Sequence, residues 1–309
     1  MHILVSGSTG LMGTSVIPAL KAQGHTIARL LRPSSRLAPL GAAGDSAVEW
    51  DPASGRFDSA AAEGADALVH LAGASIAGGR WTRSRKTILR TSRIDATRHL
   101  VAALAGLHRP PRVVVAASAI GFYGNRGEEL LTETSKPGDD FLATLCHDWE
   151  AESARATQFG ARTVMLRFGI ILAKHGGALP RMALPFRFGA GGPVGSGRQW
   201  MSWLSLDDAV GVVGFALSNA ALAGPVNAVS ANPARNADFA RAISKVLHRP
   251  AFIPAPAFAL RLVLGELADG LLLSSQRVVP TSLERAGYEF RYAELGGSLA
   301  HVLSPPGRT

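Results

Sequence analysis

The stretch Ile3-Leu4-Val5-Ser6-Gly7-Ser8-Thr9-Gly10-Leu11-Met12-Gly13 decides the fold that we expect of this chain. A short β-favouring run leads directly into glycines at positions 7, 10 and 13, and an amphipathic segment follows from Leu11 to about Ala22. This order predicts a buried strand, a tight turn and the start of a helix. Glycines in such a turn let the backbone approach a pyrophosphate, and the helix N-terminus offers unpaired N–H groups. Residues 7–13 are therefore predicted to bind a dinucleotide cofactor.

The composition is that of a globular protein, with 47% apolar and 18% charged residues in a chain of 309. This length is enough to bury a large core. The net charge of +9 comes from basic residues that are mostly scattered along the chain, so no nucleic-acid partner is predicted. The charge fits the attraction of an anionic cofactor or small-molecule substrate equally well.

The single cysteine, Cys146, excludes an internal disulfide and indicates a reducing compartment. The first 20 residues carry no basic leader ahead of an apolar run, and glycines interrupt them, so they do not predict a signal peptide. No apolar window approaches the ~18 residues of a membrane span. We therefore expect a cytoplasmic protein without a membrane span, and no metal site is predicted. The sequence does not define the oligomeric state.

Strands and helices alternate along most of the chain. Strands are predicted at 26–31, 47–50, 67–71, 112–117, 163–168 and 226–229, and helical patterns at 85–104, 140–158 and 206–218 separate most of them. This alternation predicts an α/β fold, a Rossmann-like, doubly wound parallel sheet with right-handed crossovers. Near-continuous apolar runs such as Val113–Ala117 are typical of strands that helices cover on both faces.

The alternation breaks after the strand at 163–168. Residues 174–204 are rich in glycine and contain three prolines, which predicts a long excursion from the sheet. The composition changes again after residue 248, where prolines precede a helix-like run at 258–273. We therefore predict a nucleotide-binding domain at 1–248 and a small C-terminal lobe at 249–303 that covers the substrate pocket.

Basic residues follow the second strand, where NAD-binding sheets carry a carboxylate for the ribose and NADP-binding sheets carry cations for the 2′-phosphate. Here Arg32 ends the strand, Arg36 follows, and no carboxylate is near. This predicts NADP(H), with a solvated loop as the alternative. Asp51 is predicted to bind the adenine amino group, with a turn role before Pro52 as the alternative. Small residues after the fourth strand let the backbone pass close to the cofactor, at Leu71, Ala72 and Gly73.

These residues resemble the extended short-chain dehydrogenase/reductase superfamily, and more narrowly its atypical "epimerase family" group. The carriers of the resemblance are Gly7-x-x-Gly10-x-x-Gly13, Asp51, Leu71-Ala72-Gly73, Ser118 within Ala117-Ser118-Ala119-Ile120-Gly121-Phe122-Tyr123-Gly124, and Asp207-Asp208. The hallmarks of the narrower group match residues 191–199 and Ser275-Gln276-Arg277-Val278-Val279-Pro280, the latter within a C-terminal domain of unknown function. The resemblance covers essentially the whole chain.

The resemblance implies a Tyr-x-x-x-Lys pair on the helix after the fifth strand, in which the lysine lowers the pKa of the tyrosine for proton transfer. With Glu150 aligned to the family's glutamate, Leu142 takes the tyrosine position and Cys146 the lysine position. The usual pair is therefore absent. The family's catalytic serine falls on Ala119, one residue after Ser118, and Arg93 replaces an asparagine on the preceding helix.

Replacements for the missing pair are few. Ser118 and Tyr123 are the candidate catalytic residues, and a pocket wall is the alternative for Tyr123. Cys146 and His147 are adjacent on a helix and point about 100° apart, so a buried structural cysteine is expected. Arginines can bind a carboxylate or phosphate but do not act as acids. The predicted substrate-binding residues, with salt bridging as the alternative, are Arg93 and Arg198.

The loop at 189–197 is predicted to be a mobile flap over the substrate pocket. It lacks the ending of a nucleotide P-loop. Trp200 and Trp203 are expected either to anchor this flap and line the pocket or to pack in the core.

Three functions are consistent with these features. The first is an NADP(H)-dependent oxidoreductase acting on a small anionic carbonyl or imine compound, with the proton from Tyr123, Ser118 or water. The second is a nucleotide-sugar-type epimerase, for which the loss of the tyrosine and lysine is a difficulty. The third is a non-catalytic NADP(H)-binding redox sensor. Hydride transfer is the cofactor's own chemistry and can proceed in a positioning pocket, which favours the first function.

Overall fold

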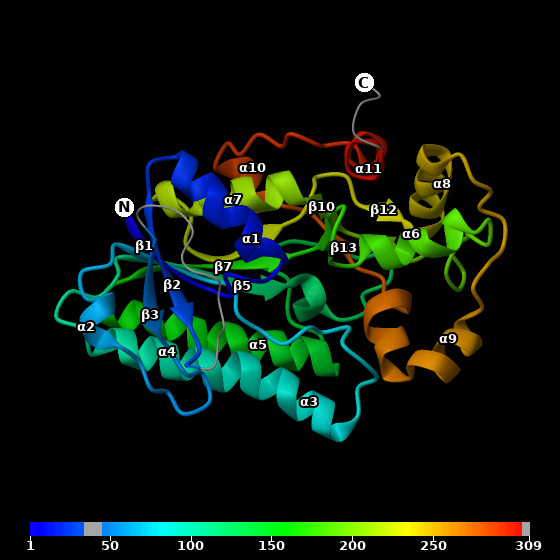
Figure 1. Ribbon diagram of the computed structural model, residues 1–309. Helices are drawn as coiled ribbons and strands as arrows, with labels where there is room; N and C mark the ends of the chain where they lie inside the picture. Colours follow the sequence, from blue (N-terminus) through cyan, green and yellow to red (C-terminus); the bar gives the residue numbers. More distant parts are fainter. Residues whose placement is uncertain (34–44, 305–309) are drawn as a thin grey trace.

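The computed structural model describes residues 1–33 and 45–304. A parallel sheet of seven strands forms its centre, in the order β11-β7-β5-β4-β1-β2-β3 (Figure 1). The strands are β1 (His2–Ser6), β2 (Thr26–Leu31), β3 (Asp45–Glu49), β4 (Ala67–His70), β5 (Val113–Ala119), β7 (Arg162–Phe168) and β11 (Gly224–Ala228). This confirms the predicted Rossmann-like α/β fold. The strand order reverses between β1 and β4, and ligands of such sheets bind outside the carboxyl ends of the strands at this point.

Helices cover both faces of the sheet. On one face lie α1 (Leu11–Ala22) and α7 (Leu206–Ser218), and on the other lie α2 (Ser59–Ala62), α4 (Ala96–Ala105) and α5 (Phe141–Ala154) (Figure 1). Alternate residues of a strand enter the two cores, because strand side chains point to opposite faces. Ile3 and Val5 pack with α1 and α7, whereas Leu4 packs with α4. The absence of solvent on either face explains the continuous apolar runs.

The helical stretch predicted at 85–104 is divided in the structure. It consists of α3 (Arg83–Arg90), a π-helical turn η1 (Thr91–Asp95) and α4. Single π turns inside α-helices are frequent at functional sites. Short 3₁₀ segments follow β5 and α5, namely η2 (Ile120–Tyr123) and η3 (Arg155–Phe159).

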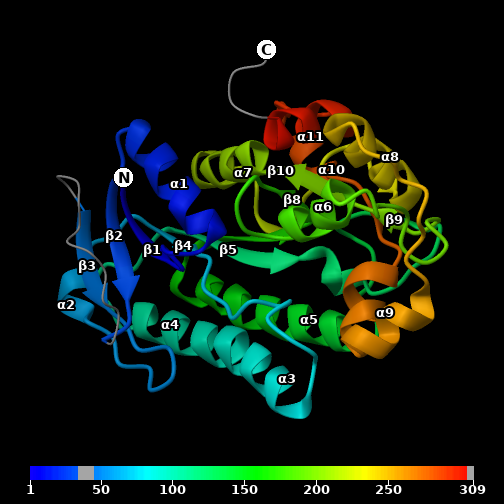
Figure 2. The same ribbon diagram turned by 45° about the vertical axis from the view of Figure 1, so that its right-hand side comes forward.

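The excursion at 174–204 contains a helix that the sequence analysis did not predict, α6 (Leu179–Arg187). Pro180 lies in its first turn, where proline is tolerated, and Pro185 lies inside it. A third core joins α6 to α8 (Asn236–Leu247) and α11 (Leu295–Leu303), beside the paired strands β8 (Ile170–Leu172) and β10 (Trp203–Ser205) (Figure 2).

The C-terminal segment returns along the carboxyl-end edge of the sheet. Its elements are α9 (Ala257–Leu264), η4 (Ala268–Leu273), β13 (Arg277–Val278) and α10 (Thr281–Arg285), and β13 pairs with β6 (Leu130–Leu131). A further antiparallel pair joins β9 (Trp200–Met201) to β12 (Ala234–Arg235). No helix in the described residues is both long enough and apolar enough to span a bilayer.

Candidate functional site

The turn between β1 and α1 is built from glycines that admit no side chain. Gly7 has a φ of +69°, and a Cβ there would lie 2.7 Å from the carbonyl carbon of Leu71. A Cβ at Gly13 would lie 2.3 Å from the carbonyl oxygen of Gly7. The Gly10 N–H donates to that same oxygen at 3.0 Å and closes the turn. Backbone contacts therefore demand glycine at positions 7 and 13.

The N-terminus of α1 is open to an anion. Gly10 precedes the helix and offers no side-chain cap, and the first turn contains no acidic residue. The first N–H groups of a helix have no intrahelical acceptor, so they and the positive end of the helix dipole face the turn. Ser8 is buried in this turn, Thr9 is exposed, and Leu11 and Met12 are half-buried. This cradle fits the pyrophosphate of a dinucleotide.

His70 at the end of β4 holds the end of β1 in place through a hydrogen bond with Ser6. The oxygen of Ser6 accepts the N–H groups of Leu71 and Ala72 at 3.1 and 3.3 Å and lies 2.6 Å from His70 Nδ1. Because both lone pairs of that oxygen are used, its hydrogen donates to Nδ1. The proton of neutral His70 is then on Nε2, which donates to Thr97 at 2.9 Å. Burial lowers the pKa of His70 to about 4, so the imidazole is neutral near pH 7 and holds the turn through its hydrogen bonds.

The adenosine end of the predicted site lies at β2 and β3. Arg32 follows the last residue of β2 and is exposed, and Arg36 falls outside the described residues. Asp51 follows β3, and its carboxylate accepts from the Ala53 N–H at 3.0 Å and from the Ser54 hydroxyl at 2.6 Å. These bonds lower the pKa of Asp51. They match the turn role that the sequence analysis gave as the alternative.

Ser118 and Tyr123 belong to one buried network at the carboxyl end of β5. The Ser118 hydroxyl donates to Glu150 at 2.6 Å, and Arg167 donates to both oxygens of Glu150 at 2.8 and 2.7 Å. Arg167 also donates to the Tyr123 hydroxyl, which in turn donates to Asn227 at 2.6 Å. Neither Arg167 nor Asn227 was predicted from the sequence, although an arginine inside an apolar strand is a signal for such a network.

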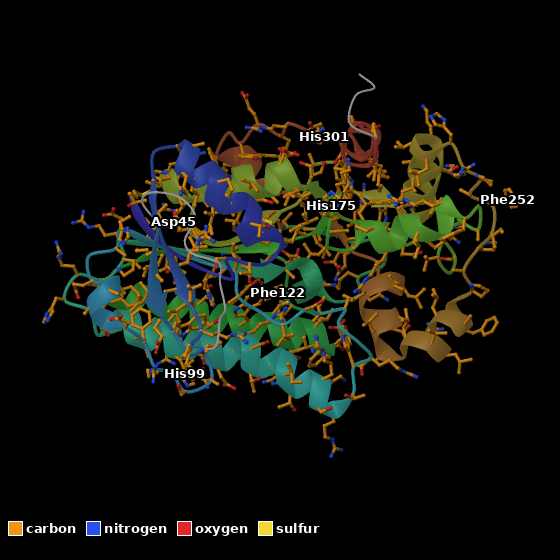
Figure 3. All side chains as sticks on the ribbon, viewed as in Figure 1. Asp45, His99, Phe122, His175, Phe252 and His301 are labelled. Carbon is orange, nitrogen blue, oxygen red and sulfur yellow. The ribbon has the colours of Figure 1, made fainter. Side chains whose placement is uncertain are left out.

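This network does not favour the catalytic role predicted for Tyr123. The ring is fully buried, its hydroxyl has both partners within the protein, and burial raises its pKa. Arg167 stacks 3.5 Å from the ring centre of Phe122, which Figure 3 labels near the middle of the molecule. The hydroxyl of Ser118 is likewise committed to Glu150. Both residues therefore brace the sheet end against α5.

The face of α5 that carries the catalytic pair in the superfamily is apolar here. Leu142 and Cys146 are both buried, and a Cβ at Gly121 would lie 3.3 Å from Leu142 and 3.7 Å from the Cys146 sulfur. Burial, followed by the charge of Glu150, raises the pKa of the Cys146 thiol to about 12. His147 is exposed. The expectation of a buried structural cysteine is confirmed.

The two predicted substrate-binding arginines lie in different surroundings. Arg93 lies in η1 against the end of β4, where its guanidinium carbon is 3.2 Å from the Cβ position of Gly73. Arg198 is exposed on the loop before β9 and contributes positive charge near Glu128. The guanidinium groups of Arg235 and Arg277 lie over the Trp200 ring, 4.5 and 4.7 Å from its centre. Trp203 is fully buried, so core packing is its role.

A cavity of about 290 Å³ lies between lining residues from the stretch 81–141 on one side and the segment 261–273 on the other. Trp81 and Phe141 form its aromatic wall, with their rings edge to face at 5.4 Å. Gly270 packs so closely that a Cβ there would lie 2.7 Å from Trp81 and 3.6 Å from Leu142. The carboxylates that line the cavity include Asp140, Glu266 and Asp269.

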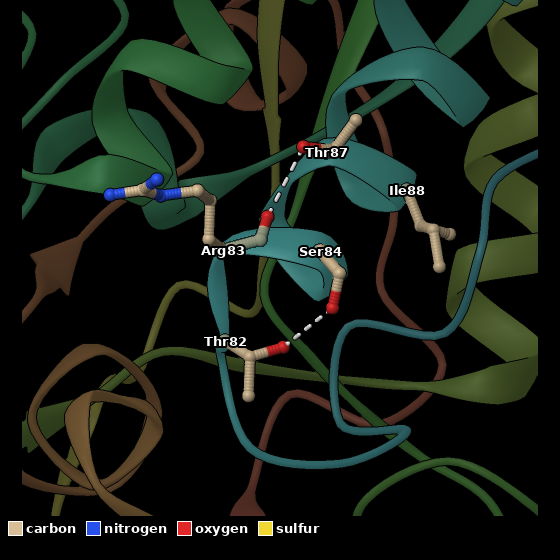
Figure 4. A pocket seen from close by; sticks show the side chains of 5 residues that line it. All are labelled: Thr82, Arg83, Ser84, Thr87 and Ile88. Carbon is tan, nitrogen blue, oxygen red and sulfur yellow. Dashed lines mark hydrogen bonds between the residues drawn. The ribbon is translucent and has the colours of Figure 1, made fainter.

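A second, larger hollow lies on the outer surface of α3 and is open to solvent (Figure 4). Its lining residues are Thr82, Arg83, Ser84, Thr87 and Ile88. Their hydroxyls bond locally, Thr82 to Ser84 at 3.0 Å and Thr87 to the Arg83 carbonyl at 3.1 Å. This hollow presents no converging catalytic groups.

Two protein-family models match most of the chain. Residues 3–229 match the NAD dependent epimerase/dehydratase family, and residues 255–302 match a domain of unknown function, DUF1731. The epimerase family protein Mb2239 of Mycobacterium bovis is 41% identical over 305 residues, which are 99% of this chain and 98% of the relative. The epimerase family protein YfhF of Bacillus subtilis is 36% identical and is covered to 98%, as is this chain.

Solved structures agree with this assignment. The human epimerase family protein SDR39U1, crystallised with NADPH, superposes with a TM-score of 0.87 at 34% identity and covers 98% of this chain and 99% of its own. MoeE5 in complex with UDP-glucuronic acid and NAD shares the fold, with a TM-score of 0.75 at 17% identity and 97% of both chains covered. The chain belongs to the NAD dependent epimerase/dehydratase family.

Proposed function

We propose that the protein is an NADP(H)-dependent oxidoreductase that transfers hydride between the cofactor and a small, anionic carbonyl or imine compound. The observation that carries this proposal is the glycine turn between β1 and α1, where Gly7 and Gly13 leave room for a pyrophosphate and no room for a side chain. Arg32 at the end of β2 supports the 2′-phosphate-bearing cofactor. The NADPH in the crystals of human SDR39U1 supports the same choice.

The proton is proposed to come from water. Bound NADP(H) supplies or accepts the hydride, and the chain contributes position and electrostatics. Leu142 and Cys146 occupy the positions of the usual acid and its lysine, and Ser118 and Tyr123 are bonded within the protein. A carbonyl or imine that receives hydride can then take its proton from solvent at the rim of the cavity.

The substrate is proposed to enter the cavity between Trp81, Phe141 and the segment 261–273. The carboxylates of this segment, Glu266 and Asp269, are paired with Lys86 and Arg261, so they repel an anion less than unpaired carboxylates would. In this arrangement the predicted C-terminal lobe at 249–303 covers the pocket, and Gly270 keeps its backbone close to Leu142. Arg198 stays a proposed substrate-binding residue on the flanking loop. The reducing compartment indicated by the free, buried Cys146 supports a cytoplasmic location.

A non-catalytic NADP(H) sensor is the second candidate, and the absence of tyrosine and lysine from the face of α5 favours it. One experiment separates the candidates. Purified protein is mixed with NADPH and a panel of 2-oxo acids, aldehydes and cyclic imines, and absorbance at the nicotinamide band is followed. Substrate-dependent oxidation supports the oxidoreductase. Tight NADPH retention without turnover supports the sensor, and inversion of a nucleotide sugar without net cofactor change supports an epimerase.

A further inference from the structure

The face of α5 beside the sheet end lacks a cation, and a neighbouring element supplies one. Cys146 stands where the superfamily has its lysine, and its thiol is buried and neutral at physiological pH. Arg93 reaches the same region from η1. Its Nη2 donates to the Ala74 carbonyl at 2.9 Å, and its guanidinium carbon lies 3.2 Å from the Cβ position of Gly73. An arginine from the preceding helix thus borders the backbone that follows β4.

The guanidinium of Arg93 is held firmly in place. It lies 5.2 Å from the ring centre of Trp149, a buried residue of α5 whose indole N–H donates to Thr97 at 3.0 Å. The neighbouring Ser92 hydroxyl accepts the Ala74 N–H at 3.2 Å and fixes the same strand end to η1. A guanidinium that lies over an aromatic ring and donates to two backbone carbonyls is restricted in orientation, so the cation is pre-organised for an oxygen-rich ligand.

The guanidinium of Arg93 bonds to backbone carbonyls. Within residues 1–33 and 45–304, no aspartate or glutamate lies within ion-pair distance of its guanidinium, and its protein acceptors are the carbonyls of Ala74 and Leu89. The nearest acidic residue in sequence, Asp95, pairs with Arg98 at 2.9 Å. A half-buried guanidinium that lacks a carboxylate partner in this part of the chain favours a ligand with oxygen acceptors, such as the ribose hydroxyls and phosphate of a nucleotide, because they replace hydrogen bonds lost on leaving water.

The sheet order identifies the part of the cofactor that meets this cation. Arg32 ends β2, which marks the adenosine half of the site, and the glycine turn at β1 marks the pyrophosphate. The remaining half must extend over the carboxyl ends of β4 and β5, on the opposite side of the reversal point. Gly73 and Ala74 lie at that end of β4, directly beside Arg93.

We propose that Arg93 binds the nicotinamide nucleotide of NADP(H), as the cation that replaces the missing lysine of α5. The inference rests on the cofactor of the proposed function, and it replaces the substrate-binding role predicted for this arginine. It explains why a short arginine-bearing π turn interrupts the helix at this point, since π turns redirect side chains into sites.

The test compares two ligands that share the adenosine half. NADPH contains the nicotinamide nucleotide, whereas adenosine 2′,5′-bisphosphate lacks it. Titration calorimetry with both ligands, together with the fluorescence of bound NADPH, is carried out on the wild type and on Arg93→Met. We expect NADPH to bind about tenfold more weakly to the variant, the loss of one charge-assisted contact. Adenosine 2′,5′-bisphosphate should bind both proteins within about twofold.

Two further variants complete the design. Arg93→Lys keeps the charge and is expected to recover part of the NADPH affinity. Arg90→Met removes the matched arginine one turn earlier, which is exposed and pairs with Asp148, and should leave both affinities unchanged. Equal loss of both ligands in Arg93→Met, or loss of neither, overturns the role of Arg93 while the cofactor assignment stands. Failure of the wild type to bind either ligand overturns the cofactor as well.

Discussion

The pyrophosphate turn and the face of α5 lie at the same end of the sheet, and the two regions are built on different principles. The turn is made of backbone: a Cβ added at Gly7 or Gly13 would lie less than 3 Å from backbone atoms, so only glycine fits there. The α5 face is made of side chains, and the helix contains neither tyrosine nor lysine; Leu142 and Cys146 lie buried on it. A site built from backbone geometry depends on glycine positions, whereas a proton-transfer site depends on the identity of a few side chains, so the two can vary independently.

The largest expected effect lies at the α5 face, in the ion pair between Glu150 and Arg167. Both side chains are nearly inaccessible, at 9% and 3% exposure. Removing one partner of a buried pair leaves an uncompensated charge, so Glu150→Gln should lower the free energy of unfolding by about 3–5 kcal/mol. Urea denaturation measures this loss. Asp148→Asn breaks the exposed pair with Arg90 and should cost less than about 1 kcal/mol. Similar losses of unfolding free energy for both variants would contradict a stabilising role of the buried pair Glu150–Arg167.

His70, which bonds to Ser6 of β1 and to Thr97 of α4, should make the free energy of unfolding depend on pH. The pKa of His70 is about 4 in the folded protein and 6.5 in the unfolded chain. As the pH falls below 6.5, the unfolded chain binds a proton at His70 before the folded protein does. The stability that the neutral, buried His70 contributes to the folded state is therefore fully present above pH 6.5 and is lost progressively down to pH 4. Its size is about 3 kcal/mol. Unfolding free energies from pH 7.5 to 4.5 for the wild type and His70→Gln should converge as pH falls. Parallel curves would contradict the buried neutral histidine.

The backbone character of the turn is tested by Gly13→Ala. The added Cβ would lie 2.3 Å from the Gly7 carbonyl oxygen, so the turn must shift. An overpacked site costs about 1–3 kcal/mol, which corresponds to a loss of NADPH affinity of up to about 100-fold. Titration calorimetry measures the change. Gly296→Ala is the matched control, because nothing lies within 4 Å of its Cβ position. Unchanged NADPH affinity in Gly13→Ala would rule out this turn as the cofactor cradle.

The smallest expected effect distinguishes two forms of the cofactor. Arg32→Ala should weaken NADPH about tenfold, the loss of one charge-assisted contact with the 2′-phosphate. NADH lacks this phosphate, and its affinity should stay within about twofold. Dissociation constants for both nucleotides, measured under one salt condition because exposed charges are screened, provide the comparison. An equal loss for NADPH and NADH would contradict the assignment of Arg32.

The sequence by itself determined the strand–turn–helix unit, the parallel sheet and its main helices. These features follow from local periodicity and from glycine spacing, which act over a few residues. It also predicted that the proton-transfer pair is absent, since that requires only the identity of Leu142 and Cys146. The helix α6 was missed because its prolines read locally as loop.

Only the tertiary structure decided how the buried polar groups are paired. Tyr123 meets Asn227 across 104 residues, and Ser6 meets His70 across 64. Such partners come together because an unpaired buried polar group costs free energy, so most such groups find a partner wherever the fold places one. No sequence spacing records that choice. The cofactor turn could be predicted because its glycines are close together in the sequence. The bonds of the Ser118 hydroxyl to Glu150 and of the Tyr123 hydroxyl to Asn227 could not, because these partners are far apart in the sequence.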